Sequence, residues 1–182
     1  MNSPCLGRPH DFDFLVGGTW LVANRRLRHR LVGGDDWITF EHRFQAQSLM
    51  DGQVSIDENV FASEGFTGLT FRTLDVAAKR WAIYWINSRD GLVQPPVHGG
   101  WDGDRGEFFG DDEDAGRPVH VRFLWERLGP DAARWSQDFA LAGRDGAADG
   151  PWETNWVMEM RRVRLRTRRR SLPATARRPG RR

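Results

Sequence analysis

The chain has 182 residues, enough for one ordinary domain with its own core, and its single cysteine, Cys5, excludes an internal disulfide and a cysteine-based zinc site. The formal net charge of +2 is unevenly distributed, because eleven Arg and no acidic residue lie between positions 161 and 182, and the rest of the chain is acidic. No stretch approaches the roughly 18 apolar residues that span a membrane, and none is typical of a signal peptide. These observations predict a cytoplasmic protein with no membrane partner.

Short strands dominate the predicted structure. Residues 1–12 carry no clear pattern and are expected to form a flexible lead-in. Ten alternating or apolar runs follow, separated by Asp- and Gly-rich turns. The runs cover residues 19–30, 37–47, 54–61, 67–74, 81–87, 97–101, 106–111, 118–126, 134–141 and 152–162.

This pattern predicts an all-β fold, an antiparallel up-and-down barrel of about ten strands over residues 13–162. A ten-strand meander exposes two edges, and closure into a barrel removes both of them. No helix-sized segment is left over to cover an open sheet. Around ten strands leave room inside for a small ligand as well as side chains.

The first strand begins with the sequence Gly18-Thr19-Trp20. This Gly-x-Trp resembles the motif at the first strand of the calycin superfamily, the lipocalins and fatty-acid-binding proteins. The pieces "GGTW", "DENVF", "GEFFGDD", "VRFLWE" and "WETNWVM" are also similar to a bacterial calycin-like family, over about residues 11 to 162. The resemblance implies that Trp20 plugs the closed end of the barrel and that an Arg of the last strand, Arg161 or Arg162, packs across it.

Side chains alternate across a strand, so a polar face can be separated from an inward one. Trp20 sets the inward parity of the first strand. The inward set is mostly aromatic and aliphatic, with a few polar members that need partners. The expected ligand contacts are Asn24, Arg26, Phe123, Trp125, Gln137, Trp156 and Met158. The run 81–87 is apolar on both faces, so its inward face stays undecided.

Three inward polar residues, Arg26, His42 and Glu58, are predicted to cluster. If the first two turns centre on residues 34 and 51, position 26 lies opposite His42 and position 44 lies opposite Glu58. The cluster has three interpretations: a structural network that satisfies itself, a set that orients a ligand, or an acid/base site. In an enzyme, His42 would be the base and Glu58 would orient it.

A polar cavity also allows the opposite parity for these strands. In that alternative, Glu41, Arg43 and Asn59 point inward instead.

No metal or cofactor is expected. The five His have no metal-ligand spacing. The Asp102–Glu107 segment lacks the third acidic position that a calcium loop carries before its Gly. A related barrel family binds haem through a His near its last strands, and here no His follows His120.

Residues 163–182 are expected to form a disordered Arg-rich tail. Such a tail could bind phosphates of nucleic acid, although it has no aromatic residue for base stacking. The leading prediction is therefore a barrel that binds a small hydrophobic molecule in a partly polar cavity. The alternatives are an enzyme (isomerase, cyclase or hydrolase) acting on a hydrophobic metabolite in that cavity, and a nucleic-acid-associated protein acting through the tail.

Overall fold

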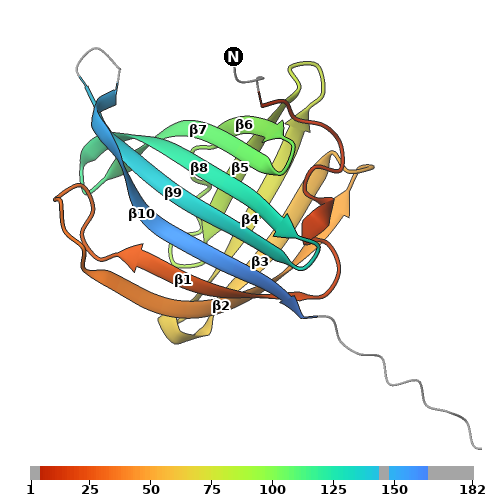
Figure 1. The fold of residues 1–182 in the computed structure, drawn as a ribbon, viewed down its shortest axis with the longest axis horizontal. Coiled ribbons are helices and arrows are strands. Elements are labelled where there is room, and N and C mark those ends of the chain that lie inside the picture. The colour runs from red at the N-terminus through yellow and green to blue at the C-terminus, as the bar shows by residue number, and fades with distance from the viewer. Residues whose placement is uncertain (1–4, 144–147, 164–182) are drawn as a thin grey trace, which may run out of the picture.

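The computed structural model describes residues 5–143 and 148–163, in which ten antiparallel strands form one closed barrel (Figure 1). Each strand pairs with its neighbours in the chain, and β10 pairs with β1. The predicted fold class is confirmed, and the predicted strands differ from the observed ones only at their ends. The strands are β1 (Thr19–Leu27), β2 (Trp37–Leu49), β3 (Val54–Phe61), β4 (Phe66–Asp75), β5 (Arg80–Asn87), β6 (Val97–Asp102), β7 (Arg105–Asp114), β8 (Arg117–Gly129), β9 (Ala132–Ala142) and β10 (Ala148–Val163).

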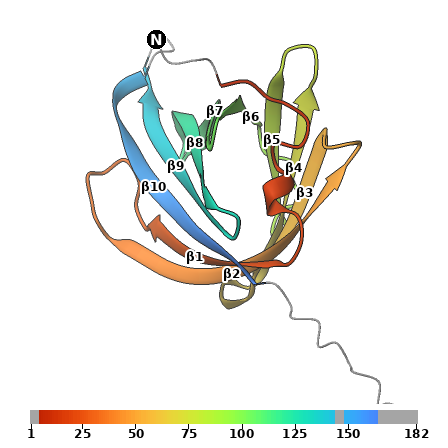
Figure 2. The same ribbon diagram turned by 45° about the vertical axis from the view of Figure 1, so that its right-hand side comes forward.

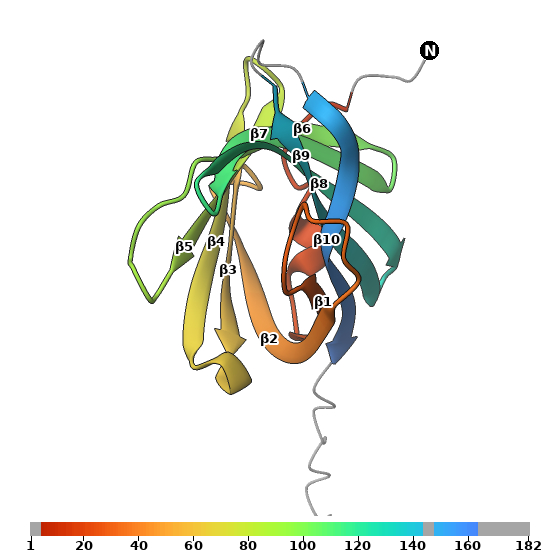
Figure 3. The ribbon, with the colours of Figure 1, turned by 90° about the vertical axis from the view of Figure 1, so that its left-hand side faces the viewer.

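One end of the barrel, which we call the closed end, carries the turns that follow β2, β4, β6 and β8. Residues 5–15 cross this end, where the 3-10 helix η1 (Asp13–Leu15) lies within the ring of strands (Figures 2 and 3). Phe12 is 1% exposed and packs edge-on against Trp81 and Trp101. Phe12 is therefore part of the barrel's core, and Gly7 is also buried, whereas Leu6 and residues 8–10 are exposed. The lead-in thus has a defined place against the barrel at these two residues. Aromatic burial of this size holds even an irregular segment in place.

Trp20 lies at the closed end with no exposed surface, and its indole N–H donates to the carbonyl of Leu15 at 2.8 Å. The guanidinium of Arg162 lies over the Trp20 ring, 4.6 Å from its centroid, and donates to the carbonyls of Val16 and Gly17. Of the two arginines predicted for this role, the structure places Arg162 here.

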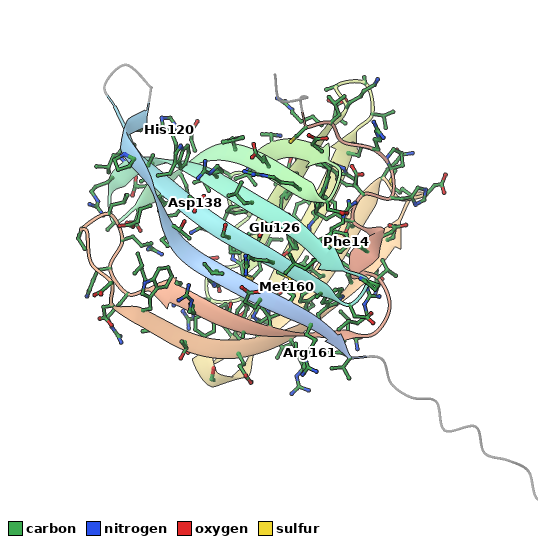
Figure 4. The ribbon with its side chains drawn as sticks, viewed as in Figure 1. Phe14, His120, Glu126, Asp138, Met160 and Arg161 are labelled. Atoms are coloured by element: carbon green, nitrogen blue, oxygen red, sulfur yellow. The ribbon has the colours of Figure 1, made fainter. Side chains whose placement is uncertain are left out.

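Arg161 is exposed at the outer side of β10, next to the inward Met160 (Figure 4). The alternation of side chains along the strand explains why only one of two adjacent arginines can reach Trp20.

Gly18 makes this approach possible. Its φ is +82°, and a Cβ there would lie 2.9 Å from the carbonyl oxygen of Val163. A residue with a side chain would meet both backbone strain and a steric clash at this point.

The register of the second hairpin corrects the predicted parity of β3. Phe44 pairs with Asn59, whereas the sequence analysis paired it with Glu58. The turn between β2 and β3 comprises residues 50–53, so its centre lies half a residue beyond Asp51. A one-residue change of partner turns every side chain of the strand to the other face. Asp57 and Asn59 therefore point inward, and Glu58 is exposed.

A β-bulge corrects part of the predicted face of β10. The pairing with β9 shifts between Thr154 and Trp156, and the extra residue, Asn155, is fully buried. Strict alternation from Trp156 would place Thr154 inside, but Thr154 is exposed and its hydroxyl donates to Asp138, which pairs with Arg122. A bulge changes the side-chain alternation at one point of a strand. Trp156, Met158 and Met160 keep their predicted inward positions.

Candidate functional site

The barrel encloses a cavity of about 170 Å³ between the closed end and the loop that precedes β6. Most of its wall is aromatic or aliphatic. Five of the seven residues expected as ligand contacts line it: Phe123, Trp125, Gln137, Trp156 and Met158. On β5 the lining includes Ile83, Tyr84 and Trp85. Ile83 and Trp85 pair with Arg72 and Thr70, which face inward on β4, and this pairing decides the parity of β5. Gly68 on the neighbouring strand leaves room for the Trp85 ring, because a Cβ there would meet it at 2.0 Å.

A polar strip on β3 and β4 interrupts the apolar wall. It consists of Asp57, Asn59, Thr70 and Arg72, all of which line the cavity. The side chains of Asp57 and Arg72 are each 3% exposed and form an ion pair of 2.5 Å. Burial of two charges is tolerated only when they are paired and hydrogen-bonded. The strip is therefore the feature that distinguishes this cavity from an ordinary hydrophobic core.

A chain of hydrogen bonds connects the strip to three further strands. Trp156 donates to the Asn24 side-chain oxygen at 3.0 Å, and Asn24 donates to Nδ1 of His42 at 2.8 Å. Nε2 of His42 then donates to the Asn59 oxygen at 3.0 Å, and Asn59 donates to Asp57 at 2.6 Å. Because each link supplies the donor for the next, the chain fixes His42 as the neutral tautomer protonated on Nε2.

Burial lowers the pKa of His42 from 6.5 to about 4, against smaller opposing effects of the Asn59 bond and the Asp57 charge. The ring is 5% exposed and lies 4.3 Å from the ring of Phe61, centroid to centroid. Both ring nitrogens are bonded to side-chain amides, and His42 is not among the residues that line the cavity. This geometry matches the structural-network interpretation of His42 better than that of a base.

The predicted contact between His42 and Glu58 is wrong. Glu58 is exposed and lies on the outer face of β3, for the register reason given above. The alternative parity was right about Asn59 but wrong about Glu41 and Arg43, which are exposed on β2.

Arg26 and Asn24 have the predicted inward orientation, but neither lines the cavity. The Arg26 guanidinium lies beside the rings of Phe40 and Trp156, which contact each other, at 5.3 and 5.1 Å from their centroids. Its burial lowers the pKa of this guanidinium, and the charge of Arg30 adds to the effect. Arg26 and His42 are thus separate, because Arg26 pairs with Ile38 and His42 pairs with Val22.

Asp57 and Arg72 are the site residues that the sequence analysis missed. Asp57 was assigned to the outer face with the rest of the β3 parity. Arg72 lies in a run, 67–74, for which polar and apolar residues do not alternate clearly. A buried Arg can be predicted only when its carboxylate partner on the adjacent strand is known. Here the partner, Asp57, was predicted to face outward.

We expect the buried neutral His42 to make stability depend on pH. The folded-state pKa of about 4 lies below the ordinary value of 6.5, so the unfolded chain binds the proton more readily between these values. Stability is therefore unaffected above about pH 7 and falls as the pH drops, by about 2–3 kcal/mol at about pH 4.5. Chemical denaturation of the protein and of His42→Gln at both pH values measures this, and the difference between the two proteins should shrink by that amount at the lower pH. An equal loss in both proteins would contradict the assignment.

The fold and site together define a closed antiparallel β-barrel with a small, mostly apolar internal cavity and one polar strip. Comparison with protein-family models and with curated proteins found no match. In residues 5–143 and 148–163, no group of three or more His, Cys, Asp or Glu is placed to hold a metal ion. The described part of the chain also has no helix long and apolar enough to cross a membrane. Residues 164–182, which contain most of the predicted Arg-rich tail, lie outside the described residues.

Proposed function

We propose that the protein is a calycin-like barrel that binds a small, mostly apolar molecule in its internal cavity. The observation that carries the proposal is the cavity itself, about 170 Å³ with an aromatic wall. A buried apolar cavity of about 150 Å³ is large enough to bind benzene. The ligand that fits is therefore a molecule of about one ring with a short substituent.

Binding fits the wall of this cavity better than turnover does. An enzyme would need an acid or base facing the substrate. Two carboxylates of the lining, Asp111 and Asp112, are exposed to solvent, and Asp111 pairs with His120 on the adjacent strand. Asp57 is held by Arg72 and Asn59, and both nitrogens of His42 are occupied. The polar strip is thus suited to orienting a ligand, as a few placed polar groups do in apolar pockets.

The test is calorimetric titration with ethylbenzene, together with native mass spectrometry of the purified protein. We expect one molecule to bind per chain, and we expect Val121→Phe to abolish binding, because Val121 is 4% exposed and lines the cavity. Leu124→Phe is the matched control, since Leu124 is on the same strand but not on the cavity wall.

Unchanged binding by Val121→Phe would place the ligand elsewhere. An absence of binding by the unmodified protein, with nothing co-purified, would contradict the proposal.

A further inference from the structure

Within the part of the chain that the structure describes, the cavity wall carries two buried hydrogen-bond donors without acceptors, one on the polar strip and one on β8. Arg72 and Trp125 both line the cavity, and they are 3% and 5% exposed. The indole N–H of Trp125 and the Nε–H of Arg72 are buried, and within the described residues neither has an acceptor. The Arg72 guanidinium lies 5.7 Å from the Trp125 ring centroid, so the two unpaired donors belong to one region of the wall.

The oxygens of Asp57 and Asn59, the acceptors of the polar strip beside Arg72, already accept hydrogen bonds from other side chains. One terminal nitrogen of Arg72 donates to Asp57 and Ser55, and the described residues provide no bond to its second terminal nitrogen. The two oxygens of Asp57 accept from Arg72 and Asn59, and the Asn59 oxygen accepts from His42. Buried polar groups are nearly always hydrogen-bonded, so two adjacent unpaired donors at a cavity wall indicate a missing acceptor.

We propose that the ligand supplies this acceptor as a neutral carbonyl group, which receives hydrogen bonds from Arg72 and Trp125. This inference rests on the proposed function, because it names the class of ligand for the same cavity. The rest of the ligand packs against the aromatic wall, which includes Phe123 and Trp135. An aryl ketone or aldehyde of one ring satisfies both the volume and the donors.

The charge balance of the strip favours a neutral carbonyl over a carboxylate. Asp57 already neutralises Arg72 at 2.5 Å, so an anionic ligand would add an uncompensated charge to a buried site. Asp111 and Asp112 also line the cavity and would repel an anion. A neutral acceptor uses the spare donors without changing the net charge.

Three probes of similar shape separate these possibilities by calorimetric titration of the full chain: acetophenone, α-methylstyrene, in which a CH₂ group replaces the carbonyl oxygen, and benzoate. We expect acetophenone to bind about tenfold more tightly than either of the others, the combined effect of two hydrogen bonds that contribute about threefold each. The comparison of acetophenone with α-methylstyrene cancels the contribution of size and apolar area.

Two variants assign the preference to the proposed donors. Trp125→Phe removes the indole N–H, and Arg72→Lys removes the guanidinium donors but keeps a positive charge beside Asp57. In each variant the preference for acetophenone over α-methylstyrene should fall at least about threefold, since about one hydrogen bond is lost. Trp135→Phe is the matched control, because it shortens another tryptophan of the cavity wall and should leave the preference unchanged. If Arg72→Lys does not fold, Trp125→Phe still decides the question.

The outcomes distinguish this inference from the proposed function. Equal binding of acetophenone and α-methylstyrene, or tighter binding of benzoate, would overturn the carbonyl assignment and leave small-molecule binding intact. A preference that survives both variants would also overturn it. Failure of all three probes to bind would count against the proposed function and this inference together.

Discussion

Replacing Trp20 by alanine should lower the free energy of unfolding by about 3–5 kcal/mol, the usual cost of deleting a fully buried aromatic side chain. Trp20 has no exposed surface, and its ring is nearly parallel to that of Phe44, with centroids 6.0 Å apart. The substitution leaves a cavity beneath Arg162 and also removes the hydrogen bond to Leu15. Chemical denaturation followed by far-ultraviolet circular dichroism measures the change.

Two matched variants test whether the closed end is held as described. Arg162→Ala should also destabilise the barrel, because Arg162 bonds the carbonyls of Val16 and Gly17 and covers Trp20. Arg161→Ala, one residue earlier and exposed, should change the stability by no more than about 0.5 kcal/mol. Similar effects of the two arginine substitutions would contradict the assignment of Arg162 to this position.

Replacing Asp57 by alanine should cost about 3–5 kcal/mol, because it leaves the charge of Arg72 buried without its partner. It also removes the acceptor at the end of the hydrogen-bond chain that begins at Trp156. The double variant Asp57→Leu/Arg72→Met should be less destabilised than Asp57→Ala, since it removes both charges together. Urea denaturation of the three proteins provides the comparison.

Glu58→Ala is the control for this experiment and a direct test of the β3 parity. Glu58 is the exposed neighbour of Asp57 on the same strand, and its substitution should change the stability by no more than about 0.5 kcal/mol. A large effect at Glu58 with a small one at Asp57 would mean that β3 has the opposite face inward.

The number, order and approximate limits of the strands were predictable from the sequence. Asp- and Gly-rich turns separate the runs, and closure follows from the need to remove two sheet edges. Trp20, Trp125 of β8 and Trp156 of β10 were also assigned correctly, because these strands carry their polar residues mainly on one face. The alternation of side chains was sufficient wherever one face of a strand was clearly apolar.

The residue pairing between neighbouring strands was predicted less accurately than the strands themselves. In the first hairpin, Arg26 was expected opposite His42, but His42 pairs with Val22. That error of four residues is even, so it left the inward orientation of Asn24, Arg26 and His42 correct. In the second hairpin, the error of one residue inverted β3, turning Asp57 inward and Glu58 outward. Because side chains alternate between the two faces of a strand, an odd error in the pairing moves them to the other face, and an even error does not.

A closed ten-strand barrel with an aromatic interior follows from the residue pattern alone. Which polar residues share that interior depends on contacts between strands, because each is stabilised there by a partner from another strand: Asp57 by Arg72, and His42 by Asn24 and Asn59. Neither member of such a pair indicates burial when it is considered alone. The packing of Phe12 across the closed end was hidden for the same reason, since its partners Trp81 and Trp101 are distant in the chain and meet it only when the barrel closes.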